Sequence, residues 1–505
     1  MSTVIHDAGR EAARAELARG TFDLLVIGGG IVGIAAAWTA AQAGLRVALV
    51  DGGDFAGATS SASTKLVHGG LRYLQTGNVK LVAENHRERR TLAAEVAPHL
   101  VSPRQFLVPI YSGGPHGAAK LGAGVFLYSA LSAFGDGLGR VVSRAQAAQQ
   151  VPGLRTEGLR AAAVYTDHQM NDSRLAIMTV RAAVAAGAVV LNHARVEGLR
   201  SRSGRISGAD LRDALDGAEF GVDARLVLNA TGPWVDRLRA LENPGAAPSV
   251  RLSKGAHVVA KRHEPWKAAL TIPLDKYRVS FAVPWEDHLL LGTTDEPYEG
   301  DPGDVRATGL DVAQILAEAG QAVTVDPADV TYAFAGLRVL PGGPGDVTTA
   351  KRETVITEGR RGMLSIAGGK WTTYRHIGRV VLDRLGVGSD VLRTMPLPGL
   401  AAPAAVMHRL TASEPMEPTV AAHLATHYGS LAFDLAELVR RDPALGAPIH
   451  PEGPDIWAQA VYARDHEWAC TPDDVLRRRT TLTLRGLDTP DVRARVADLL
   501  RTPTS

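Results

Sequence analysis

The sequence predicts an α/β protein that combines a Rossmann-like dinucleotide-binding domain, an inserted cap domain with an antiparallel sheet, and a C-terminal helical domain. Three observations predict this fold class. A glycine-rich turn follows an apolar strand near residue 28, short strand-like runs alternate with turns over 234–339, and helical patterning dominates beyond residue 419. The 505 residues are enough for about two to four domains.

Composition narrows the class of protein. Hydrophobic residues make up 45% of the chain and charged residues 21%, as in ordinary globular proteins. The 55 basic and 53 acidic residues nearly balance, so we expect no nucleic-acid partner. The single cysteine, Cys470, excludes an internal disulfide and an all-cysteine metal site, and no histidine spacing predicts a metal. The first 20 residues alternate charge with alanine, which predicts a short helix or a frayed terminus rather than a secretory signal.

The first predicted element is a strand, a glycine-rich turn and a helix over residues 23–43. Gly28 permits a tight turn, Gly30 lets the backbone approach a pyrophosphate, and Gly33 lets helix and strand pack closely. The helix start at Ile31 and Val32 offers N–H groups to the phosphates. The segment is uncharged over 24–45 and long enough to cross a bilayer, but a buried strand and helix explain it better.

The second strand, over 45–51, ends in Asp51, which is placed to accept hydrogen bonds from a ribose diol. The loop that follows is rich in hydroxyls and small residues, which suits contact with a polar ligand, although a surface loop could have the same composition. Its candidate cofactor-binding residues are Thr59, Ser60, Ser61, Ser63, Thr64, Lys65 and Leu66. These features alone do not separate FAD from NAD.

Two later small-residue turns add to this candidate site. A strand over 225–229 runs into Ala230, Thr231 and Gly232, where nothing bulky would block a dinucleotide. A second turn contains Gly369, Lys370, Thr372 and Thr373, and its glycines allow close approach to an anionic group.

The segments TSSASTKLVHGGLRYL (59–74), NATGPW (229–234), AGLRVLPG (335–342), IAGGKWTTYR (366–375) and ACTPDDVLRRRTTL (469–482) resemble the membrane-associated, FAD-dependent glycerol-3-phosphate dehydrogenases. The resemblance implies oxidation of sn-glycerol 3-phosphate to dihydroxyacetone phosphate by hydride transfer to FAD, with a quinone as electron acceptor. It also implies a cytoplasmic protein bound peripherally to the inner face of the cell membrane. A homodimer is compatible with the sequence, which does not decide the oligomeric state. No Cys or His attachment motif is visible, so we expect non-covalent FAD.

Substrate oxidation requires a clamp for the charged end and a group that takes the hydroxyl proton. Arg338 lies between apolar residues, which predicts a bound ligand or a structural carboxylate partner. The resemblance places Arg338, Arg72 and Tyr73 at the substrate, and Lys370 could serve either the substrate phosphate or the charge of the flavin. His257 and His68 compete for the proton, and we favour His257, although each could be a core histidine without a chemical role.

Alternative functions remain open at this stage. An oxidase of the same fold would pass electrons to oxygen, and a non-catalytic protein would hold flavin and metabolite without turnover. We expect Arg477, Arg478 and Arg479 to form a solvated or salt-bridged helix face, with acidic lipid as the alternative partner. The apolar run 122–131 could approach a membrane or pack within the cap.

The predicted boundaries follow the chain. Residues 20–90, 155–233 and 340–395 form a discontinuous FAD-binding domain, 91–154 and 234–339 form the cap, and 419–505 form the C-terminal helical domain.

Overall fold

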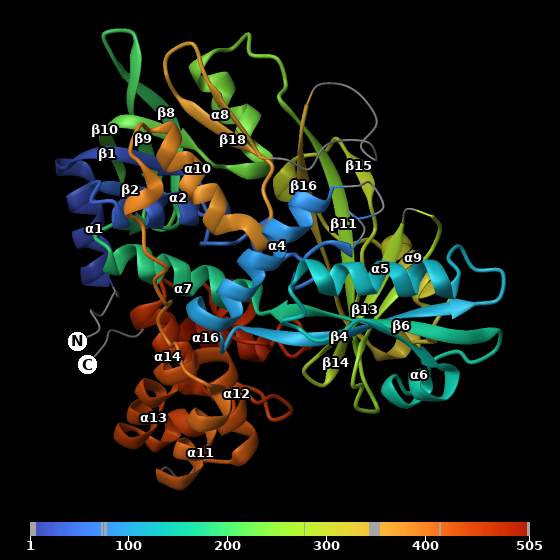
Figure 1. Cartoon of the computed structure of the whole chain (residues 1–505). Helices are drawn as coiled ribbons and strands as arrows, with labels where there is room; N and C mark the ends of the chain where they lie inside the picture. Colours follow the sequence, from blue (N-terminus) through green and yellow to red (C-terminus); the bar gives the residue numbers. More distant parts are fainter. Residues whose placement is uncertain are drawn as a thin grey trace.

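The computed structural model describes residues 7–71, 74, 78–276, 278–342, 354–413 and 416–501. In these ranges the chain forms two large β-sheets, helices that cover them, and a separate group of C-terminal helices (Figure 1). This arrangement confirms the predicted fold class. The helix predicted near the N-terminus is α1 (Asp7–Arg19).

The first sheet has a parallel centre in the order β18–β10–β1–β2–β7, with antiparallel strands added at β17 and through β9 and β8. Its strands are β1 (Thr21–Ile27), β2 (Val47–Val50), β7 (Val189–Leu191), β8 (Ala194–Arg202), β9 (Arg205–Asp213), β10 (Glu219–Asn229), β17 (Val355–Glu358) and β18 (Leu364–Ala367). Ile27 is in register with Val50 and with Asn229. The residues that follow these three strands therefore meet at one edge of the sheet.

Helices cover both faces of this sheet. The helices α2 (Ile31–Gln42), α7 (Asp172–Ala185) and α10 (Tyr374–Arg384) share one apolar core with β1 and β2, while α1 shares another core with the hairpin β8–β9. The helix α2 carries no charge because ten of its residues are buried. The long uncharged segment is thus a buried strand followed by a buried helix, and none of the described helices is long and apolar enough to span a bilayer.

The second sheet follows the order β15–β11–β14–β13–β12–β4–β6–β3, with β16 beside β11 and β5 beside β6. All of its pairs are antiparallel except β12–β4. Its strands are β3 (Leu66–Val67), β4 (Val101–Tyr111), β5 (Arg140–Ser143), β6 (Leu159–Met170), β11 (Val250–Lys261), β12 (Ala269–Pro273), β13 (Val279–Trp285), β14 (His288–Gly292), β15 (Glu296–Tyr298) and β16 (Val330–Pro341).

The strands β3 and β6 differ from the predicted boundaries, which assigned both to the FAD-binding domain. The strand β6 pairs with β4 along its whole length, from Leu159 to Met170, and β3 pairs with the end of β6. Both strands therefore belong to the cap sheet. The chain returns to the first sheet only at α7, which begins at Asp172.

The remaining helices are α4 (Val79–Thr91), α5 (Ala118–Leu131), α6 (Arg144–Gln150), α8 (Val235–Glu242), α9 (Gly309–Ala319), α11 (Pro403–Ser413), α12 (Pro418–Tyr428), α13 (Ala432–Arg441), α14 (Trp457–His466), α15 (Pro472–Asp474) and α16 (Pro490–Arg501). Of these, α8 packs on the first sheet beside β10 and β18, and the others cover the second sheet or form the C-terminal domain. The helices from α11 onward have apolar cores of their own and lie beside α7 (Figure 1).

Candidate active site

The glycine-rich turn between β1 and α2 lies at the carboxyl edge of the first sheet. Gly28 has a φ of 110°, and a Cβ there would lie 2.5 Å from the carbonyl oxygen of Ala230. A Cβ at Gly33 would overlap the carbonyl oxygen of Gly28. Only glycine fits either position, so the turn has the tight, bare backbone that a dinucleotide pyrophosphate requires.

A cavity of about 1160 Å³ extends from this turn into the space between the two sheets. This exceeds the roughly 300–1,000 Å³ of common small-molecule sites, as expected for a dinucleotide together with a substrate. The predicted site residues that line it are Gly28, Gly30, Ile31, Val32, Asp51, Thr59, Ser60, Ser63, Thr64, Leu66, His68, Ala230, Thr231, Gly232, His257, Arg338, Gly369, Lys370 and Thr372. Gly33, Ser61, Lys65 and Thr373 do not line it, and Arg72 and Tyr73 lie outside the described residues.

Asp51 follows β2 directly beside the turn. Its carboxylate accepts hydrogen bonds from the N–H groups of Gly29, at 2.6 Å, and Gly53, at 2.8 Å. Burial raises the pKa of Asp51 to about 6, although these two N–H groups oppose the shift. The carboxylate is therefore held rigidly at the cavity wall, in the place where a Rossmann-like site binds a ribose.

The hydroxyl-rich loop joins the two sheets. Ser60 Oγ accepts a hydrogen bond from the Ile31 N–H at 2.9 Å, and Thr59 Oγ1 donates one to the carbonyl of Leu337 at 2.7 Å. The ammonium of Lys65 is buried in an ion pair with Asp172. Lys65 is predicted to bind the cofactor, but its ammonium pairs with Asp172 and its side chain does not line the cavity.

His257 reaches the cavity from β11. Its Nε2 lies 2.9 Å from Thr64 Oγ1, and its ring stacks on Phe334 with centroids 5.0 Å apart. Burial, together with the positive charges of Arg338 and Lys65, lowers the pKa of His257 to about 3. The imidazole is therefore neutral at physiological pH, and these surroundings make it a weak base.

Arg338 reaches the cavity from β16, which pairs with β11. It donates hydrogen bonds to Thr293 Oγ1 at 2.9 Å and to Asp295 Oδ1 at 3.2 Å. Its side chain is 24% exposed. Arg338 therefore pairs with a carboxylate and also lines the cavity, and its contact with the substrate stays a prediction.

The segment after β18 closes the other side of the cavity. A Cβ at Gly369 would lie 2.8 Å from Val32 Cγ2, so this turn packs directly on the start of α2. Thr372 Oγ1 lies 3.2 Å from both the N–H and the carbonyl oxygen of His68, and Trp371 Nε1 donates to the carbonyl of Ser60. His68 and Lys370 are thereby brought together at one cavity.

Sequence reasoning missed the contribution of the C-terminal domain. Arg478 and Arg479 are buried and both pair with Asp54, so they form neither a solvated face nor a lipid contact. The salt-bridged alternative is correct for these two residues, whereas Arg477 lines the cavity. Nothing local marks this fold-back, because Asp54 and Arg479 lie 425 residues apart.

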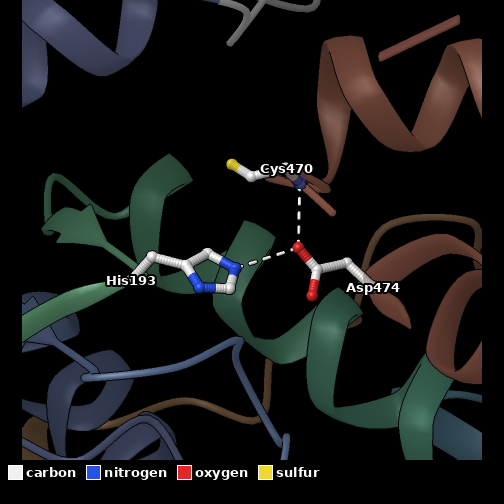
Figure 2. A group of neighbouring side chains, drawn as sticks. All are labelled: His193, Cys470 and Asp474. Atoms are coloured by element: carbon white, nitrogen blue, oxygen red, sulfur yellow. Dashed lines mark hydrogen bonds and ion pairs between the residues drawn. The ribbon is translucent and has the colours of Figure 1, made fainter. Parts of the chain in front are cut away.

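Two clusters of side chains in the described part of the chain have the residue types of a metal site: His193, Cys470 and Asp474 (Figure 2), and Glu286, His423 and His427. In the first, Asp474 Oδ2 already accepts hydrogen bonds from the N–H groups of Cys470 and Thr471 and lies 2.9 Å from His193 Nε2. Burial raises the pKa of the Cys470 thiol to about 12, which disfavours the thiolate.

In the second cluster, the Asn171 amide N–H₂ lies 2.8 Å from His427 Nδ1, while Asn171 Oδ1 accepts from the Arg174 N–H. This arrangement keeps the proton of His427 on Nε2, which faces Glu286 Oε1 at 2.6 Å. Neither cluster therefore supports a metal assignment.

A bare glycine turn at the carboxyl edge of a parallel sheet, roofed by an antiparallel sheet across a dinucleotide-sized cavity, defines an FAD-dependent oxidoreductase. The model of the FAD-dependent oxidoreductase family matches residues 23–375, and that of the C-terminal domain of alpha-glycerophosphate oxidase matches residues 391–504. The chain belongs to the FAD-dependent oxidoreductases and, within them, to the glycerol-3-phosphate dehydrogenase family.

Individual relatives agree with this placement. A probable mitochondrial glycerol-3-phosphate dehydrogenase of Caenorhabditis elegans is 37% identical, over 91% of this chain and 67% of its own length. The glycerol-3-phosphate dehydrogenase of Synechocystis is 35% identical, over 93% and 90% respectively. The FAD complex of the Bacillus halodurans glycerol-3-phosphate dehydrogenase superposes with a TM-score of 0.78 at 27% identity, over 98% of this chain and 97% of that one. The resemblance and the expected FAD cofactor are confirmed.

Proposed function

We propose that the protein oxidises sn-glycerol 3-phosphate to dihydroxyacetone phosphate with FAD and passes the electrons to a quinone. The observation that carries the proposal is that Arg338, Lys370 and His257 all line the cavity that begins at the dinucleotide turn. Two cations suit a phosphate, and a neutral imidazole suits the proton of a hydroxyl. The names of the relatives agree with this substrate.

Arg338 and Lys370 bind the substrate in this proposal, and His257 accepts its proton. Arg338, held by Asp295 and Thr293, presents its guanidinium to the substrate oxygens, and Lys370 adds a second positive charge. The arrangement orients the carbinol hydrogen toward the cofactor, which when bound accepts the hydride. His257 Nε2, now 2.9 Å from the Thr64 hydroxyl, accepts the substrate's hydroxyl proton. The phosphate charge offsets that of Arg338 and so raises the basicity of His257 during binding.

An anaerobic titration tests the proposal. Adding sn-glycerol 3-phosphate to the purified holoprotein should bleach the flavin absorbance, and glycerol at the same concentration should not. Arg338→Ala should retain FAD and lose most of the bleaching rate. A yellow protein that is not bleached by glycerol phosphate contradicts the proposed substrate and favours a non-catalytic flavin protein or another substrate.

An oxygen-using oxidase is the second candidate. The C-terminal domain matches the family model named for alpha-glycerophosphate oxidase, which favours testing this acceptor. Stoichiometric hydrogen peroxide during turnover in air would assign the oxidase activity. Faster turnover with a soluble quinone, and little peroxide, would assign the dehydrogenase activity.

We further propose that the protein acts on the inner face of the cell membrane, and that α5 with the segment after it is the contact surface. Phe126 and Leu138 are each 54% exposed, and Leu127 and Phe134 are also exposed. Exposed apolar side chains grouped in this way are typical of membrane-contact surfaces. Phe126→Ser with Leu127→Ser should reduce co-sedimentation with lipid vesicles; unchanged sedimentation would contradict this placement.

A further inference from the structure

One turn of the C-terminal domain forms part of the wall of the cofactor cavity. It consists of α15 and the five-residue π-helical turn Val475–Arg479 that follows. Asp474 and Arg477 of this turn, and Thr471 just before it, line the cavity together with Asp51 and the segment 193–197 after β7. The cavity wall is therefore built from the first sheet and from a domain more than 400 residues away in sequence.

Buried ion pairs hold the turn against the first sheet. Asp54, three residues after Asp51, pairs with the guanidinium groups of both Arg478 and Arg479. All three side chains are buried. A second link joins His193 Nε2 to Asp474 Oδ2 at 2.9 Å (Figure 2). These contacts fix the position of the backbone on either side of Arg477.

Arg477 differs from the other cations of the cavity. Arg195, Arg237, Arg338, Lys370 and Arg478 all line it, and each has an interaction within the protein. Arg477 is half-buried, and the residues that the structure describes provide it with no hydrogen bond or ion pair. A partly desolvated arginine without a protein partner suits a ligand.

The fold indicates which part of the ligand is near Arg477. The pyrophosphate belongs at Gly28–Gly33, and the ribose of the adenylate half belongs at Asp51, beyond the end of β2. From the C-terminal domain, Thr471, Asp473, Asp474, Arg477 and Arg478 line the cavity, as do 193–197 and Asp51 of the first sheet. A guanidinium there can bind phosphate oxygens in a bidentate manner or stack on the adenine ring.

We propose that Arg477 binds the adenylate half of FAD, and that the C-terminal helical domain thereby completes the cofactor site. The Asp54–Arg478–Arg479 cluster and the His193–Asp474 pair are positioning residues that hold Arg477 at the cavity. Because FAD would then contact both parts, cofactor binding also stabilises the docking of the C-terminal domain. This proposal rests on the FAD cofactor and does not depend on which substrate is oxidised.

Cofactor-binding measurements on the full-length apoprotein test the proposal without any substrate. In Arg477→Gln, the dissociation constant for FAD, followed by flavin fluorescence, should rise about tenfold, as for the loss of a hydrogen bond to a charged group. Competition by ADP, which carries the adenylate half, should weaken by the same factor, whereas FMN binding should not change. The dissociation constant of Arg477→Lys for FAD should lie between those of the wild type and Arg477→Gln.

A matched control removes a different arginine of the same domain. Arg501, on α16, is exposed and pairs with Asp498, so Arg501→Gln should bind FAD and ADP as the wild type does. Unchanged FAD and ADP affinities in Arg477→Gln would overturn the proposal. Equal weakening of ADP and FMN, with a lower melting temperature of the apoprotein, would also overturn it, since that result indicates general misfolding.

Discussion

Gly255 lies directly beneath the guanidinium of Arg338. A Cβ at position 255 would fall 2.5 Å from Nη2 and 2.7 Å from Cζ of that arginine. The two residues lie on the paired strands β11 and β16, and the arginine folds back across β11 to donate a hydrogen bond to the Lys254 carbonyl. The missing side chain therefore sets where the proposed substrate clamp lies.

Substituting Gly255 by alanine should displace this guanidinium without disturbing the cofactor turn. The atoms that must move belong to the end of a flexible side chain, so the fold should tolerate the change. We expect the catalytic efficiency with glycerol 3-phosphate to fall about tenfold to hundredfold, as for a clamp misplaced by about 1 Å. Steady-state kinetics and flavin content measure the two effects. Gly124→Ala on α5, where a Cβ meets no atom, is the control and should keep the efficiency of the wild type. If Gly255→Ala is as efficient as this control, Gly255 does not set the position of Arg338.

The raised pKa of Asp51 predicts a pH-dependent cofactor affinity. The carboxylate accepts the ribose hydrogen bonds and the neutral acid accepts them less well, so affinity should rise as pH increases through about 6. For a single proton, the dissociation constant of FAD at pH 5 should be about tenfold that at pH 7. Titrating the apoprotein with FAD from pH 5 to 8 measures this. Asp51→Asn should bind FAD weakly with no such dependence; a retained slope would assign it to another group.

The same group has the opposite effect on the stability of the apoprotein. Asp51 has an ordinary pKa of 3.8 and a folded-state pKa of about 6, so the folded state holds the extra proton between these values. The contribution of Asp51 to the free energy of unfolding therefore decreases as pH rises from about 4 to 6. Urea unfolding of the wild type and of Asp51→Asn across this range isolates the contribution. The difference between their free energies of unfolding should decrease as pH rises from about 4 to 6.

The parts of the site that the sequence predicts are those encoded locally. The turn at Gly28, the acid at Asp51 and the small residues at Ala230 each follow a strand, and parallel strands bring their carboxyl ends together. The contact between Thr64 and His257 could not be predicted, because it joins residues 193 positions apart. The pairing of β6 with β4 could not be predicted for the same reason: alternation predicts a strand but does not identify its neighbour in the sheet.

Gly33 provides the sharpest test of the cofactor turn. A Cβ there would overlap the Gly28 carbonyl oxygen, which is a backbone atom, and the Cβ has no torsional freedom of its own with which to avoid it. We expect Gly33→Ala to abolish FAD loading, measured as the flavin-to-protein ratio after purification and reconstitution. Gly117→Ala, where a Cβ meets nothing, should load normally. A yellow Gly33→Ala protein with full flavin content would show that this turn does not hold the pyrophosphate.

Asp54 should be the most sensitive single position for docking of the C-terminal domain. It pairs with two buried guanidinium groups, and removing its charge leaves Arg479 without a carboxylate partner among the described residues. Breaking a buried pair in this way costs about 3–5 kcal/mol of unfolding free energy. Trp468 contacts Phe55 at the same interface, with ring centroids 5.7 Å apart, so tryptophan fluorescence during urea unfolding can follow its opening. Glu437→Gln removes an exposed carboxylate that pairs with Arg440 and Arg441, and it should leave the midpoint nearly unchanged. If Asp54→Asn unfolds at the same urea concentration as this control, the ion-pair cluster does not hold the two domains together.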